Sequence, residues 1–411
     1  MNNNFHTLKL GKLGKISMCK RILKEETSNT EEIPFYKIST FGGKPDTFIS
    51  KKRYLEYKSK YSYPKKGDIL ISASGTIGKT VIFNDEDAYF QDSNIVWIDN
   101  NELIVRNDFL YYFYQTNPWT STNGSTIKRL YNDDLRNIVI HYPDINKQQK
   151  IVNVLSSLDS KIELNNKINK ELETMAKTLY DYWFVQFDFP NENGKPYKSS
   201  GGKMVYNQEL KREIPERWEV EKLNRFLDID TGYSFQSSSY LEDGKYKIIT
   251  IKNVKQGMLN TDKVDYINDI PERIKTTSIL KLGDILISLT GDVARVCFVN
   301  EENTLLNQRV GHIFSIDKEI SNSLIYFIMK SDHIYNKAVD IATGSNQKNL
   351  SGIDLLNLKI PFSRKLINSF LNKVQPSFEQ MLNIQKQNQE LAKLRDWLLP
   401  MLMNGQVKVE I

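Results

Sequence analysis

The feature that most constrains this chain is an internal repeat. Residues Gly67-Asp68-Ile69-Leu70-Ile71-Ser72 recur letter for letter as Gly283-Asp284-Ile285-Leu286-Ile287-Ser288. Further matches follow each copy in the same order: Ser74–Gly78 with Thr290–Ala294, Ile98-Asp99 with Ile316-Asp317, Phe109–Phe113 with Ser323–Phe327, Gly124-Ser125 with Gly344-Ser345, and Asp134-Leu135 with Asp354-Leu355. The chain therefore contains two versions of one unit, and its function should involve doing one thing twice.

Length and composition fit an ordinary globular protein. The 411 residues are 40% hydrophobic and 26% charged, which leaves room for about two to four domains. We expect neither a transmembrane helix nor an export signal, because no apolar run is long enough. With only Cys19 and Cys297, a disulfide framework or Cys-rich zinc site is not expected, and a reducing cytoplasm is. The net charge of +6 mildly favours a polyanionic partner, although many basic proteins bind no nucleic acid.

Each copy of the repeat predicts a mixed α/β unit rich in strands and loops. Short runs of β-formers bounded by Gly, Asn and Asp predict the strands, and one helix, 108–116, is expected to stop at Asn117-Pro118. The expected strands are 68–72, 79–83, 95–98 and 138–141 in the first unit, and 246–251, 284–289, 293–299 and 311–316 in the second.

A long segment with heptad spacing follows each unit. Apolar residues four and three positions apart predict a helix of about 37 residues, on the order of 55 Å long, from 147 to about 184. The first seam is Ile151, Leu155, Leu158, Ile162, Asn165, Asn169, Leu172, Ala176, Leu179 and Trp183. The second is Ile367, Leu371, Val374, Phe378, Met381, Asn388, Leu391, Leu398 and Leu402. Pro376 interrupts the second seam, so we expect a kink or a new helix start there.

The two rods are expected to pair antiparallel, because a long amphipathic helix needs a partner for its apolar face. One globular unit would then lie at each end, and a pseudo-two-fold axis would relate the halves. Asn169 and Asn388 hold matched places in the seams. They either fix the register from a buried position or lie in solvent.

These patterns give the expected fold class and segments. The fold is α/β (α+β), with two mixed, strand-rich domains separated by two long antiparallel coiled-coil helices. The polar, Gly-rich stretch between the first rod and the second unit reads as a connector with turns. The expected segments are domain 1–145, helix 146–187, linker 188–214, domain 215–362, helix 363–404 and tail 405–411.

Two motifs imitate catalytic sites. Residues 73–80, Ala-Ser-Gly-Thr-Ile-Gly-Lys-Thr, resemble a phosphate-binding loop, but Ala73 replaces the first glycine and a strand rather than a helix is expected next. A tight turn between two strands is the preferred interpretation. Asp46, Glu56 and Lys58 imitate a metal-dependent nuclease, but the second copy lacks an equivalent set.

No other catalytic centre is predicted. The sequence contains no dinucleotide or S-adenosylmethionine loop, no Asn-Pro-Pro-Tyr motif and no nucleophile elbow. The four histidines, His6, His141, His312 and His333, lack metal-ligand spacing. We therefore expect neither a catalytic residue nor a bound metal on this chain.

The chain resembles the specificity subunit of type I restriction-modification systems along nearly its whole length. The twin Gly-Asp-Ile-Leu-Ile-Ser segments, each with its following turn, are similar to that family's target-recognition domains. So are residues 183–198 (WFVQFDFPNENGKPYK), 214–218 (IPERW) and 394–405 (LRDWLLPMLMNG). The first unit departs from the pattern because it lacks an opening Ile-Pro-x-x-Trp.

The resemblance implies a non-catalytic subunit that binds double-stranded DNA in the cytoplasm. Each globular unit would read one half of a split target, while the paired helices set the spacer and dock two methyltransferase subunits. S-adenosylmethionine, ATP and Mg²⁺ would then belong to the methyltransferase and restriction/translocase partners, and this chain would carry no cofactor. A stand-alone metal-dependent nuclease and a coiled-coil protein-binding scaffold remain the alternatives.

Candidate DNA-binding residues are polar residues at places where the repeat keeps its framework but changes its side chains. Two reading heads for different half-sites must differ there. The alternative for any single Lys or Arg is a solvated surface charge. The candidates are Lys20, Arg21, Lys44, Ser74, Thr76, Lys79, Ser125, Lys128 and Arg129 in the first unit, and Ser234, Gln236, Lys252, Asn253, Thr290, Arg295, Ser345, Asn346, Gln347 and Lys348 in the second.

Overall fold

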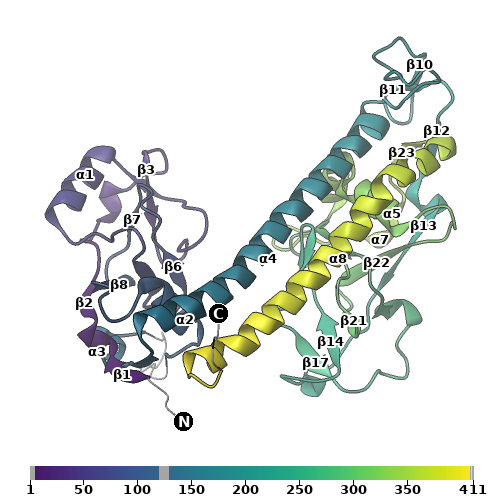
Figure 1. The fold of residues 1–411 in the computed structure, drawn as a ribbon. Helices are drawn as coiled ribbons and strands as arrows, with labels where there is room; N and C mark the ends of the chain where they lie inside the picture. The colour runs from purple at the N-terminus through teal and green to yellow at the C-terminus, as the bar shows by residue number, and fades with distance from the viewer. Residues whose placement is uncertain (1–4, 120–128, 408, 410–411) are drawn as a thin grey trace. The chain divides into compact units, whose positions relative to one another are not determined.

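The computed structural model describes residues 5–119, 129–407 and 409. The chain forms two compact units. Unit 1 comprises Met1–Ile162 with Leu391–Ile411, and unit 2 comprises Glu163–Glu390. Two long helices, α4 (Ile145–Tyr180) and α8 (Arg364–Met403), are divided between the units, so each unit contains one segment of each helix (Figure 1).

Unit 1 is built on a four-stranded antiparallel sheet in the order β2-β8-β5-β6. Its strands are Gly14–Ser17, Ile95–Asn100, Ile69–Ser72 and Thr80–Ile82 in that order. A three-stranded sheet has the order β4-β3-β7, with strands Phe48–Ile49, Ile33–Tyr36 and Tyr89–Phe90. Strand β1 (His6–Lys9) pairs with β9 (Val139–Tyr142). The helices of this unit outside α4 and α8 are α1 (Lys51–Lys60), α2 (Asn107–Gln115) and α3 (Asn132–Asn137).

Unit 2 repeats this plan. Its main sheet has the order β13-β22-β19-β20, with strands Leu227–Thr231, Val310–Ser315, Ile285–Ser288 and Val296–Phe298. Strands β12 (Glu219–Lys222) and β23 (Lys359–Phe362) pair as β1 and β9 do. The second sheet is β17-β14-β21-β18, with strands Asp265–Ile267, Tyr246–Ile249, Thr304–Leu306 and Ile279–Leu280. The shorter helices are α5 (Asn322–Lys330), α6 (Asp332–Ile341) and α7 (Gly352–Leu356), and a small hairpin joins β15 (Val254–Lys255) to β16 (Met258–Leu259).

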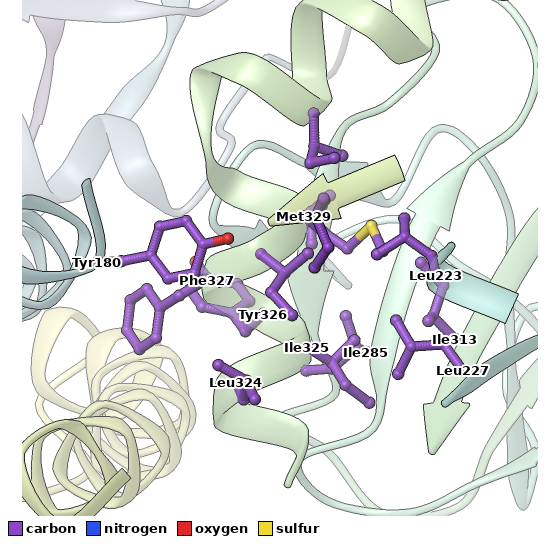
Figure 2. Packing of buried hydrophobic residues seen from close by; sticks show 14 of the residues in the cluster. Tyr180, Leu223, Leu227, Ile285, Ile313, Leu324, Ile325, Tyr326, Phe327 and Met329 are labelled. Atoms are coloured by element: carbon purple, nitrogen blue, oxygen red, sulfur yellow. The ribbon is translucent and has the colours of Figure 1, made fainter. Parts of the chain in front are cut away.

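The identical hexapeptides form the central strands β5 and β19, which are buried on both faces. Alternate side chains point to opposite faces of a strand. Ile285 and Ile287 therefore join one core with α5, while Leu286 joins another with Val254 and Leu306. Figure 2 shows Ile285 next to Ile325 of α5, with Ile313 of β22 in the same cluster. Ile69 and Ile71 are likewise separated from Leu70 in unit 1. The repeat therefore preserves a strand that must fill two cores at once.

The long helices run antiparallel, as the heptad spacing predicts. In unit 2 the Tyr180 and Phe370 rings lie 5.9 Å apart, and Asn165 Nδ2 donates to Asn388 Oδ1 over 2.8 Å. In unit 1 Arg395 forms an ion pair with Asp159 at 2.9 Å. The buried amide pair therefore involves Asn165 rather than Asn169, which is half-buried and whose Oδ1 has no hydrogen-bond partner among the described residues.

Of the kink or new helix start expected at Pro376, the new start is wrong, because α8 continues through this residue. Val374 and Phe378 on either side are 2% and 3% exposed. Their burial against unit 2 offsets the roughly 3 kcal/mol that an internal proline costs an isolated helix. Helix α4 ends at Tyr180 and is followed by a π-helical segment, Asp181–Val185, shorter than the expected rod.

The connector contains a hairpin, β10 (Met204–Asn207) with β11 (Arg212–Pro215), rather than turns alone. Strand β10 has no buried side chain, so the apolar alternation that predicts a strand is absent there. Asn207 Oδ1 accepts from the N–H groups of Glu209 and Leu210 and closes the turn. Within the described residues, no helix combines the length and apolar character needed to cross a bilayer.

Matched tyrosines attach each unit to a long helix. In unit 1, Tyr112 of α2 donates to Asp159 Oδ2 over 2.7 Å. In unit 2, Tyr326 of α5 donates to Glu173 Oε1, which also receives Lys330 Nζ at 2.8 Å. Both anchors use the same chemistry, a phenol and a cation on one helical carboxylate.

Candidate nucleic-acid interface

The turn after each central strand is organised by the serine that ends the repeated hexapeptide. Ser72 donates to the Thr76 carbonyl and accepts the Lys79 N–H at 2.9 Å. Ser288 donates to the Asp292 carbonyl at 2.6 Å and accepts the Arg295 N–H at 3.0 Å. The chain then returns as β6 or β20, antiparallel to the strand before it. This confirms the tight turn predicted in place of a phosphate-binding loop.

The segment that follows each Gly-Ser sequence attaches to this turn through main-chain atoms. Leu130 N–H donates to the Ala73 carbonyl, and Leu350 N–H donates to the Leu289 carbonyl, both at 2.8 Å. Isolated antiparallel bridges join Ser74 to Arg129 and Thr290 to Asn349. Two of the predicted groups therefore lie together in each unit. Ser125 and Lys128 are outside the described residues.

In unit 1 a loop at 91–94 gathers further candidates. Arg21 Nε donates to Asp92 Oδ2 at 3.0 Å, Arg129 donates to the Ser93 carbonyl at 3.2 Å, and Ser74 Oγ donates to Asn94 Oδ1 at 2.9 Å. No residue of this loop was among the predicted DNA-binding residues. The sequence does mark the position of this loop, because it directly precedes the apolar run that forms the buried strand β8.

The remaining unit 1 candidates are exposed. Lys79 Nζ reaches the Phe41 carbonyl, which brings the loop bearing Lys44 toward the turn. Thr76 lies in the turn itself. Lys20 Nζ lies 5.3 Å from the centre of the Tyr61 ring. We name the turn, the 91–94 loop and these surrounding residues face 1.

Face 2 is the corresponding surface of unit 2. Ser345, Asn346, Gln347 and Lys348 are all exposed, and the Lys348 carbonyl accepts the Gly291 N–H at 2.9 Å. Gly344 allows this loop to fold, since it has a φ of +108° and a Cβ there would lie 2.3 Å from the Gln347 carbonyl oxygen. Arg295 forms an ion pair with Asp292 in the turn.

Ser234 and Gln236 lie at a cleft of about 410 Å³ on the same unit. The rings of Tyr233 and Phe235 pack edge to face at 5.0 Å, and Tyr233 forms a bridge with Asn307. Gln308 N–H donates to the Tyr233 carbonyl at 3.1 Å. Ser234 is therefore connected through the 307–309 segment to the turn containing Thr290, because the Arg309 carbonyl accepts the Leu289 N–H.

Asn253 does not fit its predicted role. It is 3% exposed, Oδ1 accepts from the Thr250 N–H and hydroxyl, and Nδ2 donates to the carbonyls of Asn260 and Lys263. Both the oxygen and the nitrogen of this amide are therefore occupied by hydrogen bonds within the protein. Its neighbour Lys252 is exposed. Asn253 therefore shapes the loop, and only Lys252 is available to a ligand.

The family of the chain follows from both copies of the repeat. A family model described as the type I restriction modification DNA specificity domain matches residues 2–174 and again residues 215–387. The chain belongs to the type I restriction-modification DNA specificity family. The two matches begin close to β1 and β12, whose pairing with β9 and β23 closes each unit of this specificity subunit.

Individual relatives agree. The type I restriction enzyme MjaIX specificity subunit of Methanocaldococcus jannaschii is 31% identical over 357 residues, 84% of this chain and 78% of that protein. A putative type I restriction enzyme specificity subunit of Haemophilus influenzae, S.HindORF215P, is 52% identical over 179 residues, 43% of this chain and 46% of that protein. The crystal structure of a type I S subunit from M. genitalium shares the fold, with a TM-score of 0.52, 18% identity and coverage of 98% and 97%.

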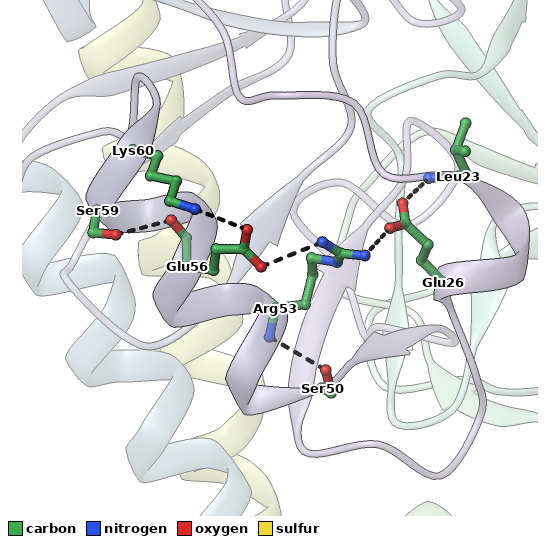
Figure 3. Close-up of polar contacts among 7 residues, drawn as sticks. All are labelled: Leu23, Glu26, Ser50, Arg53, Glu56, Ser59 and Lys60. Atoms are coloured by element: carbon green, nitrogen blue, oxygen red, sulfur yellow. Dashed lines mark hydrogen bonds and ion pairs between the residues drawn. The ribbon is translucent and has the colours of Figure 1, made fainter.

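The residues of the nuclease imitation have separate partners in this specificity subunit. Asp46 pairs with Lys37 at 2.9 Å, which lowers the pKa of its carboxyl group, while Lys58 donates to the Tyr54 hydroxyl at 2.7 Å. Figure 3 shows Glu56 between Arg53 and Lys60 on α1. Within residues 5–119, 129–407 and 409, no three potential metal-ligating His, Cys, Asp or Glu side chains gather.

The two thiols are poor nucleophiles. Burial raises the pKa of Cys19 to about 12 and also raises the pKa of Cys297. Since the thiolate is the reactive form, neither cysteine is suited to covalent chemistry near neutral pH.

Proposed function

We propose that this specificity subunit reads a split DNA target, with face 1 on one half-site and face 2 on the other. One observation carries the proposal. In each unit, equivalent main-chain hydrogen bonds attach a downstream loop to the turn after the central strand. The side chains on these loops and turns differ between the units. A shared framework with different side chains is what two readers of different sequences require.

The chemistry of the faces suits duplex DNA. Exposed Lys and Arg side chains, including Lys44, Lys252 and Lys348, can neutralise phosphates. Ser, Thr, Asn and Gln side chains on the same loops can hydrogen-bond to base edges. The binding should therefore weaken steeply as salt rises, because phosphate contacts release condensed counterions.

The paired helices are proposed to set the spacer and dock two methyltransferase subunits. Large apolar side chains remain exposed on them: Leu164 and Met175 on α4 are 52% and 67% exposed, and Leu394 and Trp397 on α8 are 43% and 56% exposed. Exposed Trp and Met are side chains that protein interfaces favour. S-adenosylmethionine, ATP and Mg²⁺ would be held by the methyltransferase and restriction/translocase subunits, and the complex would work in the cytoplasm, where the free thiols stay reduced.

Methylome sequencing of cells that express the chain with its methyltransferase subunits tests the proposal. We expect one bipartite methylated motif with an unread spacer. Exchanging unit 2 for that of another specificity subunit should change one half of the motif only. A change in both halves, or an undivided motif, would contradict the assignment of one half-site to each unit.

The spacer role has its own test. Removing one heptad from both α4 and α8 should shorten the unread spacer or abolish methylation, because the helices would hold the faces at a different separation. The single-heptad deletion in α4 alone is the control, since it misaligns the paired seams and should abolish recognition. A methylated motif with its original spacer after both deletions would rule out the helices as the ruler.

Two experiments distinguish the alternatives. A stand-alone nuclease would cut plasmid DNA when the purified chain is incubated with Mg²⁺, and we expect no cleavage. A protein-binding scaffold would not retard duplex DNA in a gel, whereas we expect a shift that weakens as salt is raised.

A further inference from the structure

One matched position outside the predicted set lies next to the turn in both units. The position is the residue just before the strand that pairs with the repeated strand. It is Asn94, before β8, in unit 1 and Arg309, before β22, in unit 2. In each unit its carbonyl accepts a main-chain hydrogen bond from the residue that follows the repeated hexapeptide. Ala73 N–H reaches the Asn94 carbonyl at 2.7 Å, and Leu289 N–H reaches the Arg309 carbonyl at 3.3 Å. The two backbones are therefore in equivalent places, while the side chains differ completely.

The backbone at this position is held firmly in unit 2. Val310, the next residue, is fully buried and its N–H donates to the Asn307 carbonyl at 3.0 Å, while Gln308 N–H donates to Tyr233. A side chain that reads a base must start from a fixed point, because small displacements spoil two-point hydrogen bonds. Arg309 meets this condition.

The side chain itself is available. Arg309 is exposed, and among the described residues its guanidinium has no ion-pair or hydrogen-bond partner. Two other cations of unit 2 are more constrained, since Arg295 pairs with Asp292 and Lys348 Nζ reaches the Val339 carbonyl at 3.3 Å. In unit 1, Asn94 Oδ1 accepts from Ser74 with one lone pair, which directs the amide while leaving Nδ2 to donate and the second lone pair of Oδ1 to accept.

We propose that Arg309 and Asn94 are the matched base-reading residues of the two faces, Arg309 for a guanine and Asn94 for an adenine. Arginine pairs two donors with the O6 and N7 acceptors of guanine, and asparagine matches the N7 acceptor and N6 donor of adenine. The assignment rests on the proposed function, and it adds the base class that each half-site should contain.

The test uses the full chain assembled with its methyltransferase subunits. Arg309→Ala should lower affinity for the wild-type target by about 10-fold or more and relax one guanine in one half-site. Arg309→Gln should move the preference at that position from guanine toward adenine, an outcome that a misfolded unit cannot produce. Asn94→Ala should relax one adenine in the other half-site and leave the first half unchanged.

Arg225→Ala is the matched control. Arg225 is an exposed arginine of the same unit whose charge acts on Asp317, just beyond the other end of β22, so it lies roughly 20 Å from Arg309 along the strand. It should leave the motif and the affinity unchanged within about twofold. The readouts are the methylated motif and gel-shift affinities for cognate and scrambled duplexes.

Two results would overturn the assignment while leaving the proposed function intact. The first is an unchanged motif with Arg309→Ala. The second is an equal loss of affinity for cognate and scrambled DNA, which would make Arg309 a phosphate contact. Failure of the proposed function looks different, because the wild-type complex would then show no bipartite motif at all.

Discussion

The two units anchor matched tyrosines to the long helices by the same chemistry but in different surroundings. In unit 1 the cation and carboxylate, Arg395 and Asp159, have side chains 32% and 34% exposed. In unit 2 the pair Lys330 and Glu173 is 9% and 23% exposed. Burial raises the pKa of both tyrosines, Tyr112 and Tyr326, so the difference lies in the exposure of the ion pairs. Both units therefore keep the connection, but its contribution to the free energy of unfolding differs. Breaking the buried pair leaves an unpaired charge away from water.

The largest test of this comparison is Glu173→Gln. Loss of the carboxylate leaves the Lys330 ammonium buried and unpaired, so we expect unit 2 to lose about 3–5 kcal/mol of its free energy of unfolding. Asp159→Asn in unit 1 should cost no more than about 1 kcal/mol, because water reaches that pair. Chemical denaturation monitored by hydrogen exchange in each unit measures both.

Glu163→Gln provides the control for these variants, since Glu163 pairs with Lys167 at the surface of the same helix, with side chains 69% and 70% exposed. It should leave stability unchanged. Equal losses from Glu173→Gln and Asp159→Asn would show that burial does not distinguish the two anchors.

The Gly-Ser loops allow the same comparison for DNA binding. Arg129→Ala in face 1 and Lys348→Ala in face 2 should each weaken binding of the assembled complex, by about 1–3 kcal/mol where the contact is to a base. A base contact alters one half of the methylated motif, whereas a phosphate contact lowers the salt dependence of binding by about one ion. Unchanged affinity together with an unchanged motif would remove that residue from its face.

The two turn serines should behave alike. Ser72 and Ser288 are each 1% exposed and make equivalent hydrogen bonds, so Ser72→Ala and Ser288→Ala should each cost about 1–2 kcal/mol by stranding buried main-chain groups. Thermal unfolding of each single variant provides the measurement. A loss in one variant and none in the other would mean that the shared hexapeptide does not support the two turns equally.

The smallest expected effect comes from the matched turn positions Gly78 and Ala294, with φ of +80° and +62°. Gly78→Ala should cost about 1–2 kcal/mol, since an alanine is strained at this φ and its Cβ would lie 2.0 Å from Trp119 Nε1. Ala294→Gly should change stability by less than about 1 kcal/mol, because relief of the strained φ is opposed by the greater freedom of the unfolded chain. Equal effects of the two variants on thermal unfolding would show that Trp119 does not distinguish the turns.

The repeated framework was predictable because it depends on local alternation. Ile69 and Leu70 point to different cores, and a strand buried on both faces requires apolar residues at every position. The turn and the downstream loop were both predicted as candidates because the copies diverge there, but their convergence was not predicted. The main-chain bonds from Leu130 and Leu350 give that inference a physical basis.

Other features depend on contacts that no sequence pattern marks. Asn253 looked like a surface amide, but its partners Asn260 and Lys263 come from a later segment of the loop. The amide pair of Asn165 with Asn388 needed the register of two helices, which heptad spacing alone leaves open. Arg309 was missed because no repeated letter marks it; only the strand register identifies it as the counterpart of Asn94.

The attachment of the 349–350 segment to the turn has a consequence for how such a protein acquires new targets. The bonds from Leu350 to Leu289 and between Gly291 and Lys348 use only N–H and C=O groups, which nearly every amino acid carries. Side chains at 345–348 can therefore be exchanged without dismantling the support beneath them. Under the proposed function, single substitutions at 345–348 would change the DNA sequence that is read while leaving these main-chain bonds in place.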